Sequence, residues 1–285
     1  MDTSKHREGR GWEGERLDLD AYLARIGYRG DRSPTIETLR ALHFAHVTSI
    51  PFENLEIVLG RGLPLDLDPL QDKLVRRARG GYCFEHARLF SAVAERLGFG
   101  VTGLLSRVSL GSGKLRPATH AVPLVTTADT DARWLCDVGF GSSPLQPIEF
   151  ADGTVMSHGG WTHRLARDGG TGEWEVQRPA GDGWEDMHHF PLNPAYAIDY
   201  VVGNHYVSTH PNSPFVGRVA LQRMEPGVLH VLDEMVLTTH RPDGSVEKQT
   251  LEAGEVPKAV SEVFGIELDA EDDTALLAHL RRDTA

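Results

Sequence analysis

Apolar residues recur at three- and four-residue steps through the first hundred positions, a pattern that predicts amphipathic helices. One helix is expected to follow Leu17 and to end at Gly27. Two more begin at the Ser-Pro pair of residues 33–34 and the Asp-Pro pair of residues 68–69, because proline is favoured in the first helical turn. The charged, glycine-rich residues 1–16 are expected to form a loose leader.

The fourth predicted helix covers residues 83–97 and is stopped by Gly98. Five of its small or apolar residues repeat every three or four positions and share one face: Cys83, Ala87, Phe90, Ala94 and Leu97. An apolar helix face of this kind packs against the core. Cys83 is therefore expected to start the helix and to point inward.

Beyond Gly98 the apolar period changes to two, which indicates β-strands. Strands are predicted at residues 101–110, 120–125, 133–138, 161–165, 173–177 and 184–187, with turns rich in glycine and aspartate between them. Further strands are expected at residues 229–238 and 246–251, then helices at residues 257–264 and 274–281. Helices, then strands, then a mixed region predict an α+β fold whose strands make an antiparallel sheet or small barrel.

Composition narrows the function classes. The 285 residues carry 29 Lys and Arg against 41 Asp and Glu, so the net charge is −12 and general nucleic-acid binding is not expected. Two cysteines do not make a disulfide framework. The start of the chain lacks the apolar core of a signal peptide, and no apolar run approaches the roughly 20 residues that span a bilayer. We therefore expect a cytoplasmic protein with free thiols and no membrane partner.

Cys83 is the first candidate for chemistry. A thiol attacks carbonyl groups as thiolate, and its ordinary pKa of about 8.5 leaves little of that form at neutral pH. The helix N-terminus favours an anion at this position, and Arg76, Arg77 and Arg79 are expected to add positive potential. The glycines at residues 80–81 allow a tight turn directly before the helix. A cysteine in this setting is also compatible with a plain buried residue, so the assignment depends on finding a base and an acid.

His120 and Asp137 supply that base and acid. His120 begins an alternating strand and shares the expected core face with Val122 and Leu124, where its second ring nitrogen needs a partner. Asp137 is the one carboxylate near the end of the apolar stretch at residues 134–141, and a buried carboxylate is seldom left unpaired. Cysteine, histidine and aspartate in these roles make a nucleophilic triad, with backbone amides at Cys83 as the oxyanion hole.

Four segments around these residues resemble the arylamine N-acetyltransferase family. They are Ile-Pro-Phe-Glu-Asn-Leu at 50–55, Arg-Gly-Gly-Tyr-Cys-Phe-Glu at 79–85, Asp-Val-Gly-Phe-Gly at 137–141, and Tyr-Val-Ser-Thr-His-Pro-Asn-Ser-Pro-Phe at 206–215. The resemblance covers roughly residues 17–220. It implies a helical bundle at residues 17–98, a β-barrel at residues 99–205 and an α/β lid at residues 206–285, with a core similar to that of papain-like and transglutaminase-like enzymes.

The resemblance also implies a ping-pong reaction. Acetyl-CoA would acylate Cys83, CoA would leave, and the nitrogen of an arylamine or hydrazine would then attack the thioester. The family pattern places substrate contacts at Phe52, Gly139 and Phe140, and CoA contacts at Tyr206, Asn212 and Ser213. No metal is expected.

Two positions depart from the family pattern, and alternatives follow from them. Ala87 stands where the family usually has asparagine, and Ser142 where it usually has a further glycine. Some members are amide synthases that take a polyketide chain from an acyl carrier protein and close a macrolactam. A cysteine amide hydrolase with the same triad, and a binding protein that has lost catalysis, also remain open.

Other chemistry-bearing residues are interpreted as structural. Cys136 adjoins Asp137, but strand alternation sends its side chain to the opposite face, into the core. Four histidines suggest metal without the cysteine or carboxylate spacing of a ligand set, and they are His158, His163, His188 and His189.

Overall fold

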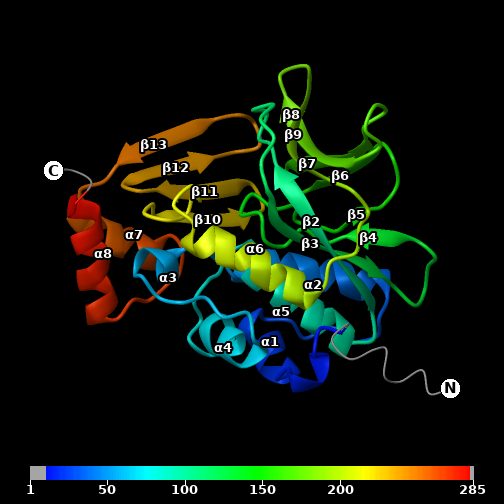
Figure 1. The fold of residues 1–285 in the computed structure, drawn as a ribbon, viewed down its shortest axis with the longest axis horizontal. Coiled ribbons are helices and arrows are strands. Elements are labelled where there is room, and N and C mark those ends of the chain that lie inside the picture. The colour runs from blue at the N-terminus through cyan, green and yellow to red at the C-terminus, as the bar shows by residue number, and fades with distance from the viewer. Residues whose placement is uncertain (1–10, 283–285) are drawn as a thin grey trace.

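The computed structural model describes residues 11–282, and its amino-terminal part is helical as the periodicity predicts (Figure 1). The helices are α1 (Leu19–Arg25), α2 (Ile36–Ser49), α3 (Leu55–Val58), α4 (Leu67–Gln71) and α5 (Cys83–Arg96). Asp18 caps α1 by accepting a hydrogen bond from the N–H of Ala21. The helix predicted from residues 68–69 is α4, continued by a π-helical turn at Asp72–Arg76.

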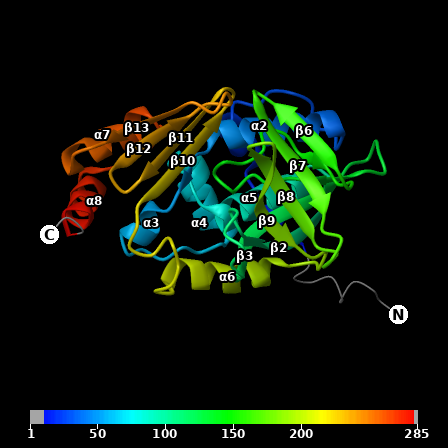
Figure 2. The same cartoon turned by 90° about the horizontal axis from the view of Figure 1, so that it is seen from above.

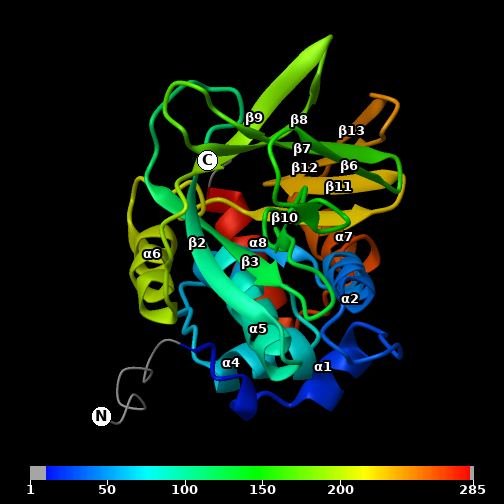
Figure 3. The same ribbon diagram turned by 90° about the vertical axis from the view of Figure 1, so that its right-hand side faces the viewer.

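Eight antiparallel strands follow and curl into a nearly closed barrel (Figure 3). They are β2 (Gly100–Val108), β3 (Ala118–Thr126), β4 (Arg133–Leu135), β5 (Ile148–Glu149), β6 (Thr154–His158), β7 (Trp161–Arg167), β8 (Trp174–Ala180) and β9 (Gly183–Phe190). Their order in the sheet is β5-β4-β3-β2-β9-β8-β7-β6. Leu104, Leu165, Met187 and Phe190 fill the interior. The predicted α+β class with an antiparallel barrel is confirmed.

The strand predicted at residues 133–138 is too long. Pairing with β3 ends at Leu135, after which the N–H of Cys136 donates to the carbonyl of Pro123 at 2.8 Å and the N–H of Val138 turns back onto Cys136. The chain therefore leaves the sheet directly before Asp137. This bend frees the Asp137 side chain from the alternation of the strand.

A second antiparallel sheet has the order β1-β10-β11-β12-β13. Its strands are β1 (Phe52–Glu53), β10 (Ala220–Glu225), β11 (Val228–Asp233), β12 (Val236–His240) and β13 (Val246–Thr250). The single strand predicted at residues 229–238 is wrong, because a turn with Glu234 at φ 53° divides it into β11 and β12. Helices α7 (Val256–Glu262) and α8 (Ala270–Arg282) cover one face of this sheet, around Leu232, Phe264 and Leu276.

Helix α6 (Ala197–Thr209) was not predicted. Its buried residues Tyr200, Asn204 and Val207 keep helical spacing, but the stripe includes a polar residue, and two valines, Val201 and Val202, are exposed. The predicted boundary between residues 205 and 206 falls inside this helix. The division of the chain into three domains stays a prediction.

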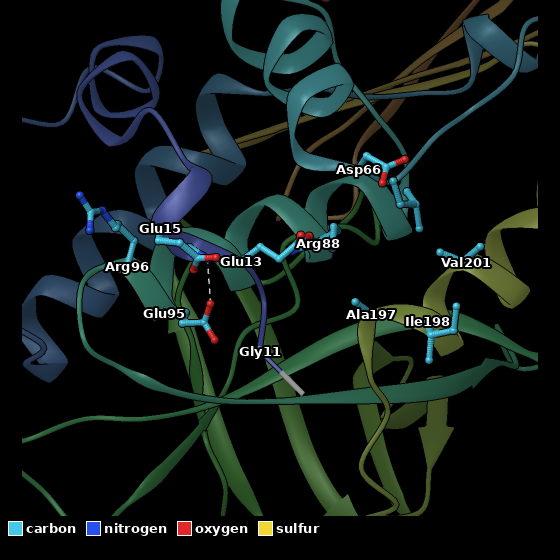
Figure 4. A pocket seen from close by; sticks show the side chains of 12 residues that line it. Gly11, Glu13, Glu15, Asp66, Arg88, Glu95, Arg96, Ala197, Ile198 and Val201 are labelled. Carbon is cyan, nitrogen blue, oxygen red and sulfur yellow. Dashed lines mark hydrogen bonds and ion pairs between the residues drawn. The ribbon is translucent and has the colours of Figure 1, made fainter. Parts of the chain in front are cut away.

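Residues 11–16 pack against α5 and do not form a loose leader, while residues 1–10 lie outside the described part. Trp12 is buried, and Glu95 of α5 accepts hydrogen bonds from the N–H groups of Trp12 and Gly14. Arg88 pairs with Glu13 and donates to the carbonyl of Trp12. Figure 4 shows Glu13, Arg88 and Glu95 on one side of a surface hollow of about 680 Å³, with the apolar residues Ile198 and Val201 of α6 on the other.

Helix α5 packs against β2 and β3 of the barrel, and the turn before it bridges to β1 of the second sheet through Gly81 and Phe52; seen from above, it runs below the junction of the two sheets (Figure 2). Its apolar face joins the main core, as predicted, with Ala87, Phe90 and Ala94 all buried. The start of α5 therefore lies where barrel and second sheet meet. Among the described residues, no helix is long and apolar enough to cross a membrane.

Candidate active site

The turn before α5 is held by the segment that leads into β1. The N–H of Gly81 donates to the carbonyl of Pro51 at 3.2 Å, and the N–H of Glu53 donates to the carbonyl of Gly81 at 2.8 Å. A side chain at Gly80 would collide with the Pro51 carbonyl, so this close approach requires glycine. Hydrogen bonds between these two backbone segments thus fix the start of α5, where Cys83 lies.

Buried ion pairs surround this turn. Glu85 accepts from the N–H of Tyr82 at 3.1 Å and is bound by Lys73 Nζ at 2.8 and 2.9 Å. Arg79 lies among three carboxylates, at 3.5 Å from Glu53, 3.6 Å from Glu56 and 3.2 Å from Asp272. These contacts fix the turn by charge pairing in the interior.

The predicted contribution of the upstream arginines to the potential at Cys83 is not supported. Arg76 and Arg77 are half exposed and pair with Asp72 at 3.2 and 2.9 Å. Arg79 is neutralised by its three carboxylate neighbours. A compensated charge has little effect at a distance, so these arginines add little positive potential at Cys83.

Cys83 and His120 lie side by side at the wall of a cavity of about 670 Å³. The Cys83 side chain is 5 % exposed, and its Sγ lies 3.6 Å from the carbonyl oxygen of Thr119. His120, on β3, is buried and bonds through Nε2 to Asp137 Oδ1 at 3.0 Å. Cys83 lies close enough to His120 to raise the pKa of its imidazole. The structure therefore brings the three predicted catalytic residues together in the predicted order.

Electrostatics at the site favour an imidazolium. Burial alone would lower the pKa of His120, but the charge and hydrogen bond of Asp137, together with Cys83, raise that pKa to about 10. Burial would raise the pKa of Asp137, but its two imidazole neighbours hold it far below the ordinary value. A protonated His120 places a positive charge beside the sulfur of Cys83.

The cavity contains most of the predicted ligand contacts. Phe52, Gly139 and Phe140 line it beside Cys83, as do Tyr206 and Asn212. Ser213 is buried, where its hydroxyl donates to the carbonyl of Val207 and accepts from the N–H of Phe215. Its contact with CoA stays a prediction, as do the other ligand contacts.

Comparison with known proteins identifies the family. A family model described as N-acetyltransferase matches residues 35–273. The arylamine N-acetyltransferase of Mycolicibacterium smegmatis is 38% identical over 257 residues, which cover 88% of this chain and 93% of that protein. The chain belongs to the arylamine N-acetyltransferase family. The predicted resemblance is confirmed, and the chain is an enzyme of this family, whose catalytic residues form a Cys-His-Asp triad.

Two solved structures of arylamine N-acetyltransferases share the whole fold. The Nocardia farcinica protein is 52% identical with a TM-score of 0.92, covering 96% of this chain and 99% of that one. The Mycobacterium marinum protein, solved in complex with CoA, is 34% identical with a TM-score of 0.86, covering 93% and 99%. The agreement extends through both sheets, so the likeness is not confined to the motifs.

His188 contacts the triad, although the sequence predicts no catalytic role for it. It lies on β9, is fully buried, and its Nε2 lies 2.9 Å from Asp137 Oδ2. The only signal in the sequence is a histidine in a barrel strand. His120, Asp137 and His188 do offer donor atoms within 4.8 Å of one another. Hydrogen bonds of ordinary length account for this spacing.

The departures from the family pattern also have a place in the structure. Ala87 is buried in the core, and Ser142 is half buried beyond Phe140. His86, one residue before Ala87, takes part in a buried chain of hydrogen bonds with His46 and Tyr22, at 2.8 Å each. Its Nε2 faces the carbonyl of Pro51 at 3.3 Å. Beside the nucleophile, this chain ties α1, α2 and α5 together.

We expect Gly139→Ala to impair the site without unfolding the protein. A Cβ at this position would lie 2.8 Å from Cys83 Cα and 3.0 Å from the Cys83 carbonyl oxygen, so the backbone of the nucleophile must move. Misplacement of a reacting group by about 1 Å costs on the order of 100-fold in rate. Iodoacetamide alkylation of Cys83 and steady-state turnover measure the loss. Gly169→Ala is the matched control, since that glycine is exposed with no neighbour within 4 Å; equal rates in both variants would contradict the close-packing argument.

Proposed function

We propose that this enzyme transfers an acetyl group from acetyl-CoA to the nitrogen of an arylamine or hydrazine, through a thioester on Cys83. The observation that carries the proposal is the wall of the 670 Å³ cavity, where Cys83 and the Asp137-bound His120 lie beside aromatic side chains. Family membership supports the same chemistry. The two free thiols also suit the cytoplasm expected from the sequence.

In the first half-reaction, the Cys83 thiolate attacks the carbonyl carbon of the donor thioester. The oxyanion that forms is stabilised by backbone N–H groups at the start of α5, which have no carbonyl partner within the helix. When the tetrahedral intermediate collapses, the bond to the sulfur of CoA breaks. The proton held by His120 accompanies the departing thiolate, so CoA leaves as a thiol and Cys83 carries the acetyl group.

In the second half-reaction, the amine nitrogen attacks the acetyl carbon on Cys83. His120, now neutral, removes the proton that the nitrogen loses, and Cys83 leaves as a thiolate. The starting thiolate and imidazolium are thereby restored. Asp137 keeps the ring of His120 in one orientation through both steps.

The lining of the cavity suits these two substrates. Phe52, Phe140 and Phe215 offer aromatic faces and edges for an aryl ring. Arg116 and Arg218 also line the cavity, where cations suit the phosphates of CoA, and Arg218 is shared with Asp233. Tyr206, Asn212 and Ser213 remain the proposed contacts with acetyl-CoA. Of these, Ser213 is buried. The CoA complex of the Mycobacterium marinum relative supports a CoA thioester as donor.

Intact-protein mass spectrometry tests the proposal. Wild-type protein mixed with acetyl-CoA in the absence of amine is expected to gain one acetyl group, and to lose it when an arylamine is added. Cys136→Ala, which alters the other free cysteine, is expected to keep the modification, whereas Cys83→Ala is expected to lose it. A wild-type protein that stays unmodified would refute the proposed donor.

The alternatives give different results in the same assay. Acylation by the thioester of an acyl carrier protein, without acylation by acetyl-CoA, would indicate an amide synthase. Turnover of an amide by water alone, with no thioester donor present, would indicate a cysteine amide hydrolase.

A further inference from the structure

His188 lies beside the catalytic histidine and bonds to the second oxygen of Asp137. It sits in the middle of the barrel, on β9, at a position paired with Val108 of β2 and Val176 of β8. Its ring centroid lies 4.9 Å from that of His120 and 5.9 Å from that of Phe190, with the latter pair stacked. Neighbours on several strands thus fix the direction in which Nε2 points.

The hydrogen bond to Asp137 determines which nitrogen of His188 carries a proton. A carboxylate oxygen can only accept, so Nε2 must donate across the 2.9 Å gap to Oδ2. The opposite nitrogen, Nδ1, is buried and has no hydrogen-bond partner among the described residues. A proton there would be a buried donor without an acceptor, which is costly. The ring is therefore neutral, and burial lowers the pKa of His188 in agreement with this.

Both oxygens of Asp137 are occupied in consequence. Oδ1 accepts from His120 at 3.0 Å and Oδ2 accepts from His188 at 2.9 Å, so the carboxylate cannot rotate without breaking a bond. Hydrogen bonds to the charged form of an acid favour that form. Because His188 is neutral, it holds the anion without adding a positive charge that would compete with the imidazolium of His120.

We infer that His188 is a positioning residue that orients and keeps ionised the Asp137 carboxylate, and so maintains His120 as the proton carrier for Cys83. This inference rests on the proposed thiol chemistry. His188 acts through Asp137 and lines no part of the substrate cavity. Its loss is therefore expected to lower kcat and the rate of acylation while leaving KM for the amine nearly unchanged.

The groups that act on His188 electrostatically are few. Burial lowers the pKa of His188 most, Asp137 raises it, and His120 and His189 lower it further. Burial likewise lowers the pKa of His163 on β7, and His188 adds the smallest contribution there. His189, the next residue, is only half buried and pairs with Glu173 at 2.8 Å. It is thus a histidine on the same strand that has no contact with the triad.

Three variants test the inference. His188→Gln keeps an N–H donor on a side chain of similar reach, His188→Phe keeps a ring without a donor, and His189→Gln is the matched control. We expect acylation by acetyl-CoA to fall about 10- to 100-fold in His188→Phe. This is the range found for residues that orient a functional side chain by a hydrogen bond and do not contact the substrate. The other two variants should stay within about threefold of wild type. Alkylation of Cys83 at pH 6 should follow the same ranking.

Nuclear magnetic resonance gives a second readout that does not depend on His188→Phe folding. In wild-type protein with ¹⁵N-labelled histidine, His188 should show a neutral ring protonated at Nε2 throughout pH 6 to 8, assigned by its loss in His188→Gln. A ring protonated on both nitrogens, or bare at Nε2, would overturn the inference. So would full acylation by a folded His188→Phe. If Cys83→Ala still catalysed the transfer, the proposed function itself would fail, which is a separate outcome.

Discussion

Cys83→Ser is expected to reduce acetyl transfer by about 10⁴-fold or more, a loss typical of a removed nucleophile. The hydroxyl occupies nearly the same space, so the cavity and the contact with His120 remain. What changes is acidity, because a thiol is ionised by a neighbouring imidazolium near neutral pH and a hydroxyl is not. The effect is measured as the rate at which free CoA is released when the enzyme is mixed with acetyl-CoA and an arylamine.

The matched control for Cys83→Ser is Cys136→Ala. Cys136 is fully buried 53 positions further along the chain, and burial raises its pKa well above the ordinary value, so it is not a nucleophile. The variant should lose some stability and keep kcat. If Cys83→Ser retained activity within tenfold of wild type, ionisation of the thiol would not be what drives the reaction.

The local part of this site could be predicted from the sequence because each signal lies within one element. The three- and four-residue spacing after Cys83 and the glycines before it define a helix start, and the structure has α5 begin at that residue. Alternation along β3 predicts that His120 faces the interior, and the residue is buried there. Strand alternation does not account for the orientation of Asp137, because the chain bends out of the sheet after Leu135.

Contacts between distant segments could not be predicted in the same way. The neighbours of Arg79 in the sequence predict that its charge acts on Cys83, because they include none of the carboxylates that neutralise it. Asp272, which lies 193 positions away on α8, helps to neutralise it. His188 is likewise 51 positions from Asp137, and nothing in its strand distinguishes it from His189 except the face on which it lies.

Burial of polar residues explains why the apolar pattern predicts neither α6 nor the packing of residues 11–16. Helix α6 has Asn204 in its buried stripe, where it donates to the carbonyl of Leu63 at 2.7 Å, so its apolar periodicity is weak. In the segment of residues 11–16, Trp12 is the one large apolar residue. Its burial depends on Glu95 and Arg88 of α5, which hold the backbone around it. Hydrophobic patterns detect neither case, because hydrogen bonds to polar side chains help to hold both segments in place.

Asp137→Asn is expected to lower the acylation rate about 10³- to 10⁴-fold while leaving the fold intact. The neutral amide cannot attract a proton to His120 as the carboxylate does, and it must present its NH₂ group to one of the two histidines. The ring of His120 is then free to adopt the wrong tautomer, which costs up to about 10⁴-fold in triad enzymes. Single-turnover acylation by acetyl-CoA measures this step. Asp182→Asn, at an exposed position in the turn between β8 and β9, should be indistinguishable from wild type.

Asp137→Asn is also expected to change how the stability of the folded protein depends on pH. The pKa of His120 is about 10 in the folded protein against 6.5 ordinarily, so its pairing with Asp137 stabilises the fold fully below pH 6.5. That stabilisation is lost as the pH rises through about 10. The difference in melting temperature between wild type and Asp137→Asn should therefore shrink between pH 7 and pH 10.5, measured by thermal unfolding. A difference that stayed constant over this range would mean that His120 is neutral in the resting enzyme, and that it acts as a base without first forming an ion pair with Cys83.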